Sequence, residues 1–338
     1  MKIGRSKWLA AIGVALLSVT AASGQTAEKG PWWPSPFGAQ DQAGNSNYIT
    51  PEKILTSLKL AKTGKIYELG HIYDAKMPAF GDRPYVLLTQ PANEVTKADQ
   101  EAVHTDYFTG FLGHMGTQFD GLGHMGRALK MPDGSYKAFF YNGYTEADLT
   151  GPKKGAGGVE KLGVEQIKPI ITRGLLVDIA GYKGVATLDA RYEVTLADVL
   201  GALKKEGLSE DSIQPGDAVL LNFGWAANWD NPSKYNDGHF WVGENKGSPG
   251  INHEVAKWMV SKKVSIVGAD TCCVMMMPQP EGDAYNLHVD LLPYGVFLME
   301  NLDLRELAKD KAYEFLYLNL TERLRGATGS PVRPIAIR

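Results

Sequence analysis

Residues 114–124 carry the side chains best suited to chemistry, and they read His-Met-Gly-Thr-Gln-Phe-Asp-Gly-Leu-Gly-His. In an extended chain alternate side chains share a face, so His114, Gln118 and Asp120 are expected to point the same way. Imidazole, amide oxygen and carboxylate together suit a borderline or hard divalent ion. The glycines after Asp120 are expected to let the backbone turn sharply, which would bring His124 back toward the same pocket.

The same segment also allows a purely structural interpretation. A lone histidine in a strand is more often a hydrogen-bonded structural residue than a metal ligand, and the chain has seven histidines. Against this, His114 and His124 flank a carboxylate on a shared face in a glycine-rich context. Gly116 is expected to leave a gap where a bulky side chain would block a metal. Spacing alone leaves the two interpretations open.

Short apolar, β-branched runs alternate with helical stretches in the rest of the chain. Buried strands are expected over residues 174–179, 217–223 and 264–269. Helices are expected over residues 51–62, 195–206 and 252–261, capped by Thr50, Thr195 and Asn252. Residues 313–320 alternate aromatic and polar side chains and could form a closing strand. This alternation predicts an α/β fold, which we interpret as a single domain.

The bulk composition excludes some classes of function. The chain has 338 residues, of which 22% are charged and 44% apolar, with a formal net charge of −3. This is an ordinary globular composition. It provides no basic surface for nucleic acid and no cationic run for a membrane surface. A small molecule is therefore the expected partner.

The N-terminus has the pattern of a secretory signal peptide. Lys2, Arg5 and Lys7 precede an apolar run over residues 8–19, and small residues follow at 21–24. The run is shorter than the roughly 20 residues that a membrane-spanning helix needs, which disfavours the alternative of an uncleaved anchor. We expect a cleavable signal peptide over residues 1–24, a mature domain over 25–338, and a periplasmic or secreted protein.

The only two cysteines, Cys272 and Cys273, are adjacent. A disulfide between neighbouring residues is strained, so disulfides are not expected to hold this fold together. Two small core residues beside a strand are the preferred interpretation. A soft metal site or a redox pair is the alternative.

The motif resembles the signature His-x-Gly-Thr-His-x-Asp-x-x-x-His of the cyclase-like family, which includes bacterial kynurenine formamidase and isatin hydrolase. Later blocks resemble the family too, among them His288-Val-Asp-Leu-Leu and Glu300-Asn301-Leu302. Similar blocks cover most of the chain after the N-terminal segment, in the expected order. The resemblance implies the family's swivelling β/β/α fold and a homodimer or homotetramer.

Carried over by position, the resemblance also implies roles for individual residues. His114 and Asp120 match metal ligands, and His124 matches a histidine proposed as catalytic acid/base. His288 and Glu300 match the pair that completes a second metal site in two-metal members. In single-metal members such a pair is positional or structural.

Gln118 departs from the family signature, because it stands where the signature has a second metal-binding histidine. An amide oxygen is a neutral and weaker ligand than imidazole. It should lower the affinity for Zn²⁺ and favour Mn²⁺ or another oxygen-tolerant ion. It could also abolish the site. We favour a retuned metal site, because the rest of the motif is intact.

The resemblance implies hydrolysis of an amide, often a cyclic one, or of a related ester. A bound divalent ion activates water and polarises a carbonyl. Thr117 and glycine N–H groups could support the oxyanion. The aromatic residues hint at an aromatic or cyclic substrate, although a tryptophan or phenylalanine is more often a core residue than a ligand contact. Candidate pocket walls are Trp32, Trp33, Phe37, Phe108, Phe111, Trp225, Trp229 and Trp241. A metal-dependent lyase or cyclase and a non-catalytic binding protein are the alternatives.

Overall fold

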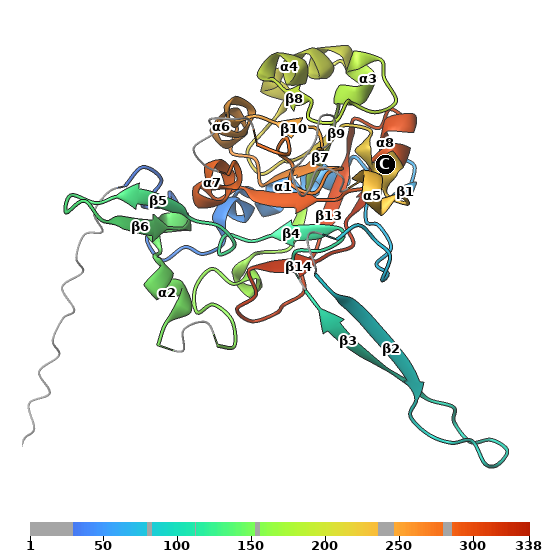
Figure 1. Ribbon diagram of the computed structural model, residues 1–338. Helices are drawn as coiled ribbons and strands as arrows, with labels where there is room; N and C mark the ends of the chain where they lie inside the picture. The colour runs from blue at the N-terminus through green and yellow to red at the C-terminus, as the bar shows by residue number, and fades with distance from the viewer. Residues whose placement is uncertain (1–29, 80–82, 112, 153–155, 236–246, 280–285) are drawn as a thin grey trace, which may run out of the picture.

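The strands predicted from the sequence lie next to one another in a nine-stranded sheet at the centre of the computed structural model (Figure 1). The structure describes residues 30–79, 83–111, 113–152, 156–235, 247–279 and 286–338. The predicted signal peptide and Trp241 lie outside the described residues. In sheet order the strands are β1 (Ile66–Glu68), β15 (Ile335–Ile337), β13 (Glu314–Asn319), β7 (Ile170–Asp178), β9 (Ala218–Asn222), β11 (Ile266–Ala269), β12 (Phe297–Glu300), β4 (Gln118–Asp120) and β14 (Gly329–Pro331).

The four central strands β7, β9, β11 and β12 run parallel, and the strands that flank them pair antiparallel. Their apolar side chains are buried on both faces, as is usual for parallel sheets. Leu175 and Val177 pack in one core layer with helix residues Val199 and Val255, whereas Leu176 packs in the opposite layer. The α/β expectation is therefore confirmed. The strand expected over residues 313–320 is present as β13, but it lies inside the sheet, between β15 and β7.

Eight α-helices occur in the described residues: α1 (Pro51–Leu58), α2 (Glu146–Thr150), α3 (Ile179–Lys183), α4 (Leu196–Lys205), α5 (Pro232–Tyr235), α6 (His253–Ser261), α7 (His288–Leu291) and α8 (Arg305–Lys309). The three predicted caps are present, since Thr50, Thr195 and Asn252 each accept a backbone N–H from the first helical turn. Helix α1 ends at Leu58, earlier than predicted. None of the helices in the described part of the chain is long and apolar enough to span a membrane.

Two hairpins that the sequence reasoning missed extend from the body (Figure 1). Strands β2 (Tyr85–Pro91) and β3 (His104–Gly110) form the first, and β5 (Arg127–Lys130) and β6 (Tyr136–Phe139) form the second. A further short pair joins β8 (Glu193–Val194) to β10 (Gly250–Ile251). The β2–β3 hairpin leaves apolar side chains exposed, including Leu88 and Tyr107.

The position of β4 in the sheet is the feature that matters most for function. It lies between β12 and β14 and pairs antiparallel with both. Gln118 is the register partner of Glu300, and Asp120 is the partner of Leu298. Residues paired in this way share a face of the sheet, so the motif and Glu300 are brought together across 182 positions of sequence.

Away from that face, a buried acid at the end of α4 should make stability depend on pH. Glu206 accepts the Asp178 N–H at 2.6 Å through Oε1, while its Oε2 is buried with no hydrogen-bond partner in the described part of the chain. Burial raises the pKa of Glu206 from 4.5 to about 8. Between these two pKa values, Glu206 holds a proton in the folded chain that it has lost in the unfolded chain. Raising the pH through this window therefore lowers the free energy of unfolding.

We expect Glu206→Gln to have a melting temperature close to that of the parent chain at pH 5 and a higher one at pH 9, because glutamine keeps the acceptor and has no charge to bury. Melting followed by circular dichroism across this range measures the effect. Parallel pH profiles for the two proteins would contradict the assignment.

Candidate metal centre

The motif is extended only over β4, so the predicted shared face is right for Gln118 and Asp120 but not for His114. The chain bends before β4, and Gly116 has φ +62°. A Cβ at Gly116 would lie 2.4 Å from the Tyr73 ring. Glycine is therefore required at this position by its backbone conformation and by the Tyr73 ring.

The predicted turn after Asp120 is present and brings His124 back to His114. The N–H of His124 donates to the Gly121 carbonyl at 3.0 Å. The rings of His114 and His124 stack with their centroids 4.0 Å apart. A Cβ at Gly121 would lie 3.0 Å from the Thr328 carbonyl oxygen, so close packing, more than backbone freedom, selects glycine there.

Asp120 lies at the centre of the site and is completely buried. Its Oδ1 lies 3.0 Å from His114 Nδ1 and 3.4 Å from Gln118 Nε2. Its Oδ2 has no hydrogen-bond partner among the described residues, and His288 Nε2 lies 3.6 Å from it. A buried carboxylate oxygen without a donor is a position at which a cation is favourable.

His288 and Glu300 join the same site from the other side. His288 is the first residue of α7, and its Nε2 lies 3.0 Å from Glu300 Oε1 at the end of β12. Both side chains are about 5% exposed. The predicted distant partners are therefore in direct contact with each other and adjacent to Asp120.

Two groups of potential ligand atoms share Asp120. Within each group the atoms lie within 4.8 Å of one another. One is His114, Asp120 and His124, and the other is Asp120, His288 and Glu300. Histidine nitrogen and carboxylate oxygen are the donors that Zn²⁺ and Mn²⁺ accept. Together with the unpartnered Asp120 oxygen, this donor set fits a divalent ion. His124 is thus close enough to be a ligand as well as an acid/base.

The charges of the site are strongly coupled. Burial works against ionisation of Asp120, but His124, His114 and His288 lower its pKa below the usual range. Burial and the charge of Asp120 raise the pKa of Glu300 to about 8. Burial opposes protonation of His288, yet the Asp120 carboxylate 3.6 Å away and the hydrogen bond to Glu300 raise its pKa to about 10. A positive charge is therefore favoured between the two carboxylates, where a metal ion would also be stabilised.

His124 differs from His288 in its protonation. Burial is the main cause that lowers the pKa of His124 to about 4, although the charge of Asp120 acts in the opposite direction. The imidazole is neutral at pH 7 and has a lone pair with which to accept a proton or bind a cation.

Gln118 is placed between the two carboxylates. Its Nε2 donates to Glu300 Oε2 at 2.7 Å and to Asp120 Oδ1 at 3.4 Å. In this orientation the side chain is a hydrogen-bond donor to both acids, and rotation of the amide by 180° about its final bond would present the oxygen expected of a ligand.

Thr117 does not have the arrangement expected of an oxyanion donor. Its hydroxyl is fully buried, accepts the His71 N–H at 2.8 Å and donates to the Asn301 carbonyl at 2.6 Å. No hydroxyl proton remains for a substrate. The residue instead ties the motif to the backbone that follows Glu300, and the expected oxyanion role is corrected accordingly.

A cavity of about 250 Å³ opens onto the site. Its apolar wall is formed by methionines, Met115, Met125 and Met277, and the described residues contribute no aromatic side chain to it. None of the candidate aromatic walls in the described residues lines this cavity, and Trp32, Trp225 and Trp229 are buried, as the core alternative predicts. Sequence reasoning also missed Arg83 as a lining residue. No local pattern marks that residue, because it reaches the site from a separate segment.

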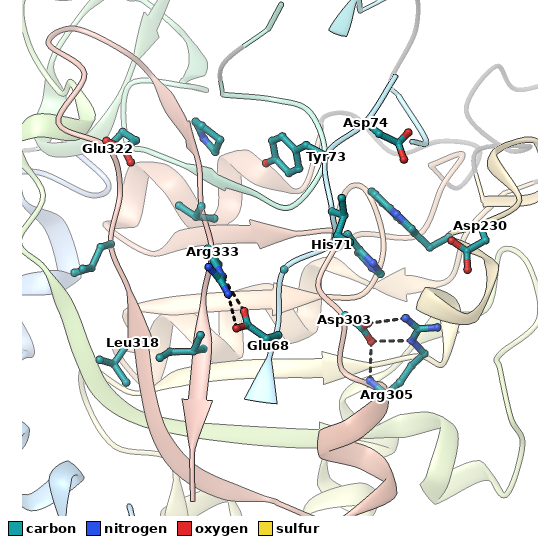
Figure 2. A pocket seen from close by; sticks show the side chains of 17 residues that line it. Glu68, His71, Tyr73, Asp74, Asp230, Asp303, Arg305, Leu318, Glu322 and Arg333 are labelled. Atoms are coloured by element: carbon teal, nitrogen blue, oxygen red, sulfur yellow. Dashed lines mark hydrogen bonds and ion pairs between the residues drawn. The ribbon is translucent and has the colours of Figure 1, made fainter. Parts of the chain in front are cut away.

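A larger cleft of about 1140 Å³ is lined by other residues, among them Glu68, His71 and Arg333 (Figure 2). His71 stacks on Trp229 there at 3.9 Å, and the pairs Glu68–Arg333 and Asp303–Arg305 lie along its wall. These carboxylates already have arginine partners, and the cleft contains none of the predicted ligands. The candidate metal ligands therefore lie at the smaller cavity.

Comparison with known proteins identifies the family of the chain. The Cyclase family matches residues 67–274, more than half of the chain. A crystal structure described as a novel cyclase is 32% identical, with a TM-score of 0.75 over 89% of this chain and 98% of that chain. Among curated proteins, the search found no match.

Isatin hydrolases have the same fold at lower identity. Isatin hydrolase A from Ralstonia solanacearum is 16% identical, with a TM-score of 0.57 over 85% of this chain and 97% of that chain. Isatin hydrolase A from Labrenzia aggregata, bound to benzyl benzoate, is 17% identical, with a TM-score of 0.56 over 84% and 97%. The match over residues 67–274 and the 32% identical relative together show that the chain belongs to the Cyclase family.

Proposed function

We propose that this protein is a metal-dependent hydrolase that opens an amide or ester bond in a small molecule, such as a cyclic amide, imide, lactone or formyl-anilide. The observation that carries the proposal is the fully buried Asp120, shared by two groups of ligand atoms, with one carboxylate oxygen unpartnered. The fold shared with the isatin hydrolases supports it.

His114, Asp120, His288 and Glu300 would hold Mn²⁺ or Zn²⁺, with Gln118 as a further oxygen ligand. When bound, such an ion supplies Lewis-acid polarisation of the scissile carbonyl and lowers the pKa of water. His124, neutral at pH 7, is placed to take a proton from the attacking water and return it to the leaving nitrogen or oxygen.

Arg83 is suited to the product. Hydrolysis of an amide or ester releases a carboxylate, and Arg83 lines the cavity beside His114. One guanidinium N–H group donates to the His114 carbonyl. We propose that the positive charge of Arg83 at the cavity wall attracts the carboxylate that the reaction releases. The cavity volume of about 250 Å³ favours a substrate with one or two small rings.

The test combines metal analysis with a substrate screen. Protein purified without chelator is assayed for bound metal and then for hydrolysis of lactams, imides, lactones and formyl-anilides. We expect a stoichiometric divalent ion and a product that contains an added water. A product without added water would indicate a lyase or cyclase. Ligand binding without turnover would indicate a binding protein. Protein that neither carries a divalent ion nor binds one added would overturn the proposal.

Gln118→His should restore the second histidine of the family signature. We expect about tenfold or greater tightening for Zn²⁺, with a smaller change for Mn²⁺, because imidazole is a stronger zinc ligand than a neutral amide oxygen. Competition with a chromogenic chelator measures both affinities. Gln90→His, on the exposed β2 strand, is the matched control. Equal zinc affinity in all three proteins would show that position 118 does not contact the metal.

We also propose that the chain forms a homo-oligomer through the β2–β3 hairpin, with a second copy of the chain covering it. Support comes from its exposed apolar side chains and from the marginal stability of an isolated two-stranded hairpin. Leu88→Glu should lower the mass measured by light scattering toward that of a monomer, whereas Gln90→Glu should not. An unchanged mass for Leu88→Glu would exclude this surface.

Residues 1–24 remain a proposed cleavable signal peptide that directs the protein to the periplasm or the exterior. N-terminal sequencing of the protein recovered from the periplasmic fraction tests this, with Gln25 or a close neighbour expected as the first residue.

A further inference from the structure

The two adjacent cysteines are not only core residues, because both line the cavity of the metal centre. They follow β11, and both are present as thiols about 8% exposed. The Sγ atoms of Cys272 and Cys273 lie 2.8 Å apart, against about 2.05 Å for a disulfide bond. A small change of geometry would therefore bring the two sulfur atoms to bonding distance.

The backbone just after the pair has an unusual conformation. Val274 has φ +58°, and the Met275 N–H donates to the Cys273 carbonyl at 2.5 Å across it. A β-branched residue rarely adopts this conformation, and such strain concentrates at functional sites. The local sequence gives no reason for it, since valine favours an extended strand.

Backbone and side-chain hydrogen bonds link the cysteine pair to the proposed metal centre. Thr271, which precedes it, accepts the Asn301 N–H at 2.9 Å. Asn301 follows Glu300, and its side chain donates to the Gly116 carbonyl at 2.7 Å. A shift of residues 271–274 would therefore act on the backbone on both sides of the proposed ligand set.

We propose that Cys272 and Cys273 form a thiol modification site at which a peroxide produces a vicinal disulfide. The disulfide then weakens metal binding in the adjoining cavity. Its effect on the metal rests on the proposed function, while formation of the bond does not. In the first step one thiol reduces the peroxide, giving a sulfenic acid and water. The second thiol then attacks the sulfenic sulfur, forming the S–S bond and releasing a second water.

The bond is expected to be easily reversed. Adjacent Cα atoms across a trans peptide are about 3.8 Å apart, below the usual range for disulfides, so the bridge is strained and readily reduced by a dithiol. The hydrogen bond with Cys272 and burial hold the pKa of the Cys273 thiol well above its usual value, so oxidation should be slower than at an exposed thiol.

The experiment treats the purified full-length mature protein with hydrogen peroxide and follows thiols, mass and metal affinity. The chain has only two cysteines, so the thiol count under denaturing conditions should fall from two to zero. The intact mass should fall by two hydrogen atoms, and dithiothreitol should restore it. The affinity for Mn²⁺ should fall about tenfold in the oxidised protein. Phenylarsine oxide, which bridges two neighbouring thiols, should add once and block the oxidation.

Single variants separate this proposal from the proposed function. Cys272→Ser and Cys273→Ser should fold, cannot form the bridge, and should keep their metal affinity after the same treatment. Oxygen addition in place of hydrogen loss, or disulfide-linked dimers, would overturn the modification site. Disulfide formation with no change in Mn²⁺ affinity would overturn the link to the metal. A protein that binds no metal but loses both thiols together would contradict the proposed function and leave the modification site supported.

Discussion

Replacing Asp120 with asparagine is expected to remove bound metal almost completely and to lower hydrolysis by on the order of 10³-fold. Asp120 belongs to both groups of ligand atoms, so its loss affects either a one-metal or a two-metal site. Asparagine keeps the shape and can still hydrogen-bond to His114, which limits the cost to folding. Metal content by mass spectrometry and the rate on the best substrate of the screen are the two measurements.

The matched control is Asp189→Asn, which changes an exposed aspartate in the same way. It should keep both metal and activity. Circular dichroism checks that the Asp120 variant is folded. A folded Asp120→Asn protein that keeps a full complement of metal would contradict the ligand assignment, whatever its activity.

His124→Asn is the second change with a large expected effect. If His124 is the acid/base, kcat should fall by roughly 10²- to 10⁴-fold with KM little changed and metal retained. The reason is that proton transfer is lost while the ligand set remains. Steady-state kinetics and metal analysis on the same preparation measure both quantities.

The same experiment discriminates between the two roles that the geometry allows His124. Its ring stacks on His114 within ligand distance of Asp120, so a metal-binding His124 would take the ion with it when replaced. His104→Asn, on the exposed β3 strand, controls for histidine loss elsewhere. Loss of metal together with activity in His124→Asn, but not in His104→Asn, would make His124 a ligand and leave the acid/base unassigned.

The elements that could be predicted are those whose causes are local. The caps by Thr50, Thr195 and Asn252 depend on residues within one turn, and the buried strands β7, β9 and β11 depend on continuous apolar runs. The β2–β3 hairpin was missed because its strands mix polar and apolar residues that no core sorts into faces.

The residues of the candidate site could be predicted from the sequence, but much of their geometry could not. The motif and the distant pair Glu300 and His288 were named from sequence, and the structure brings them together. The bend at Gly116 depends on Tyr73. The hydrogen bonds of the Thr117 hydroxyl depend on His71 and Asn301. These contacts come from other segments, so no window around the motif contains the information. The cavity-facing position of the cysteines was hidden for the same reason.

The pairing of β4 with β12 has a consequence for the whole chain. Gln118 and Glu300 meet across 182 positions of sequence, so an unfolded polypeptide cannot present this ligand set. An ion that binds only the native state stabilises it by mass action, by about 2.7 kcal/mol at a hundredfold excess over Kd. Metal supply would then govern the lifetime of the protein as well as its activity, because chains folded in metal-poor conditions would open more often to proteases.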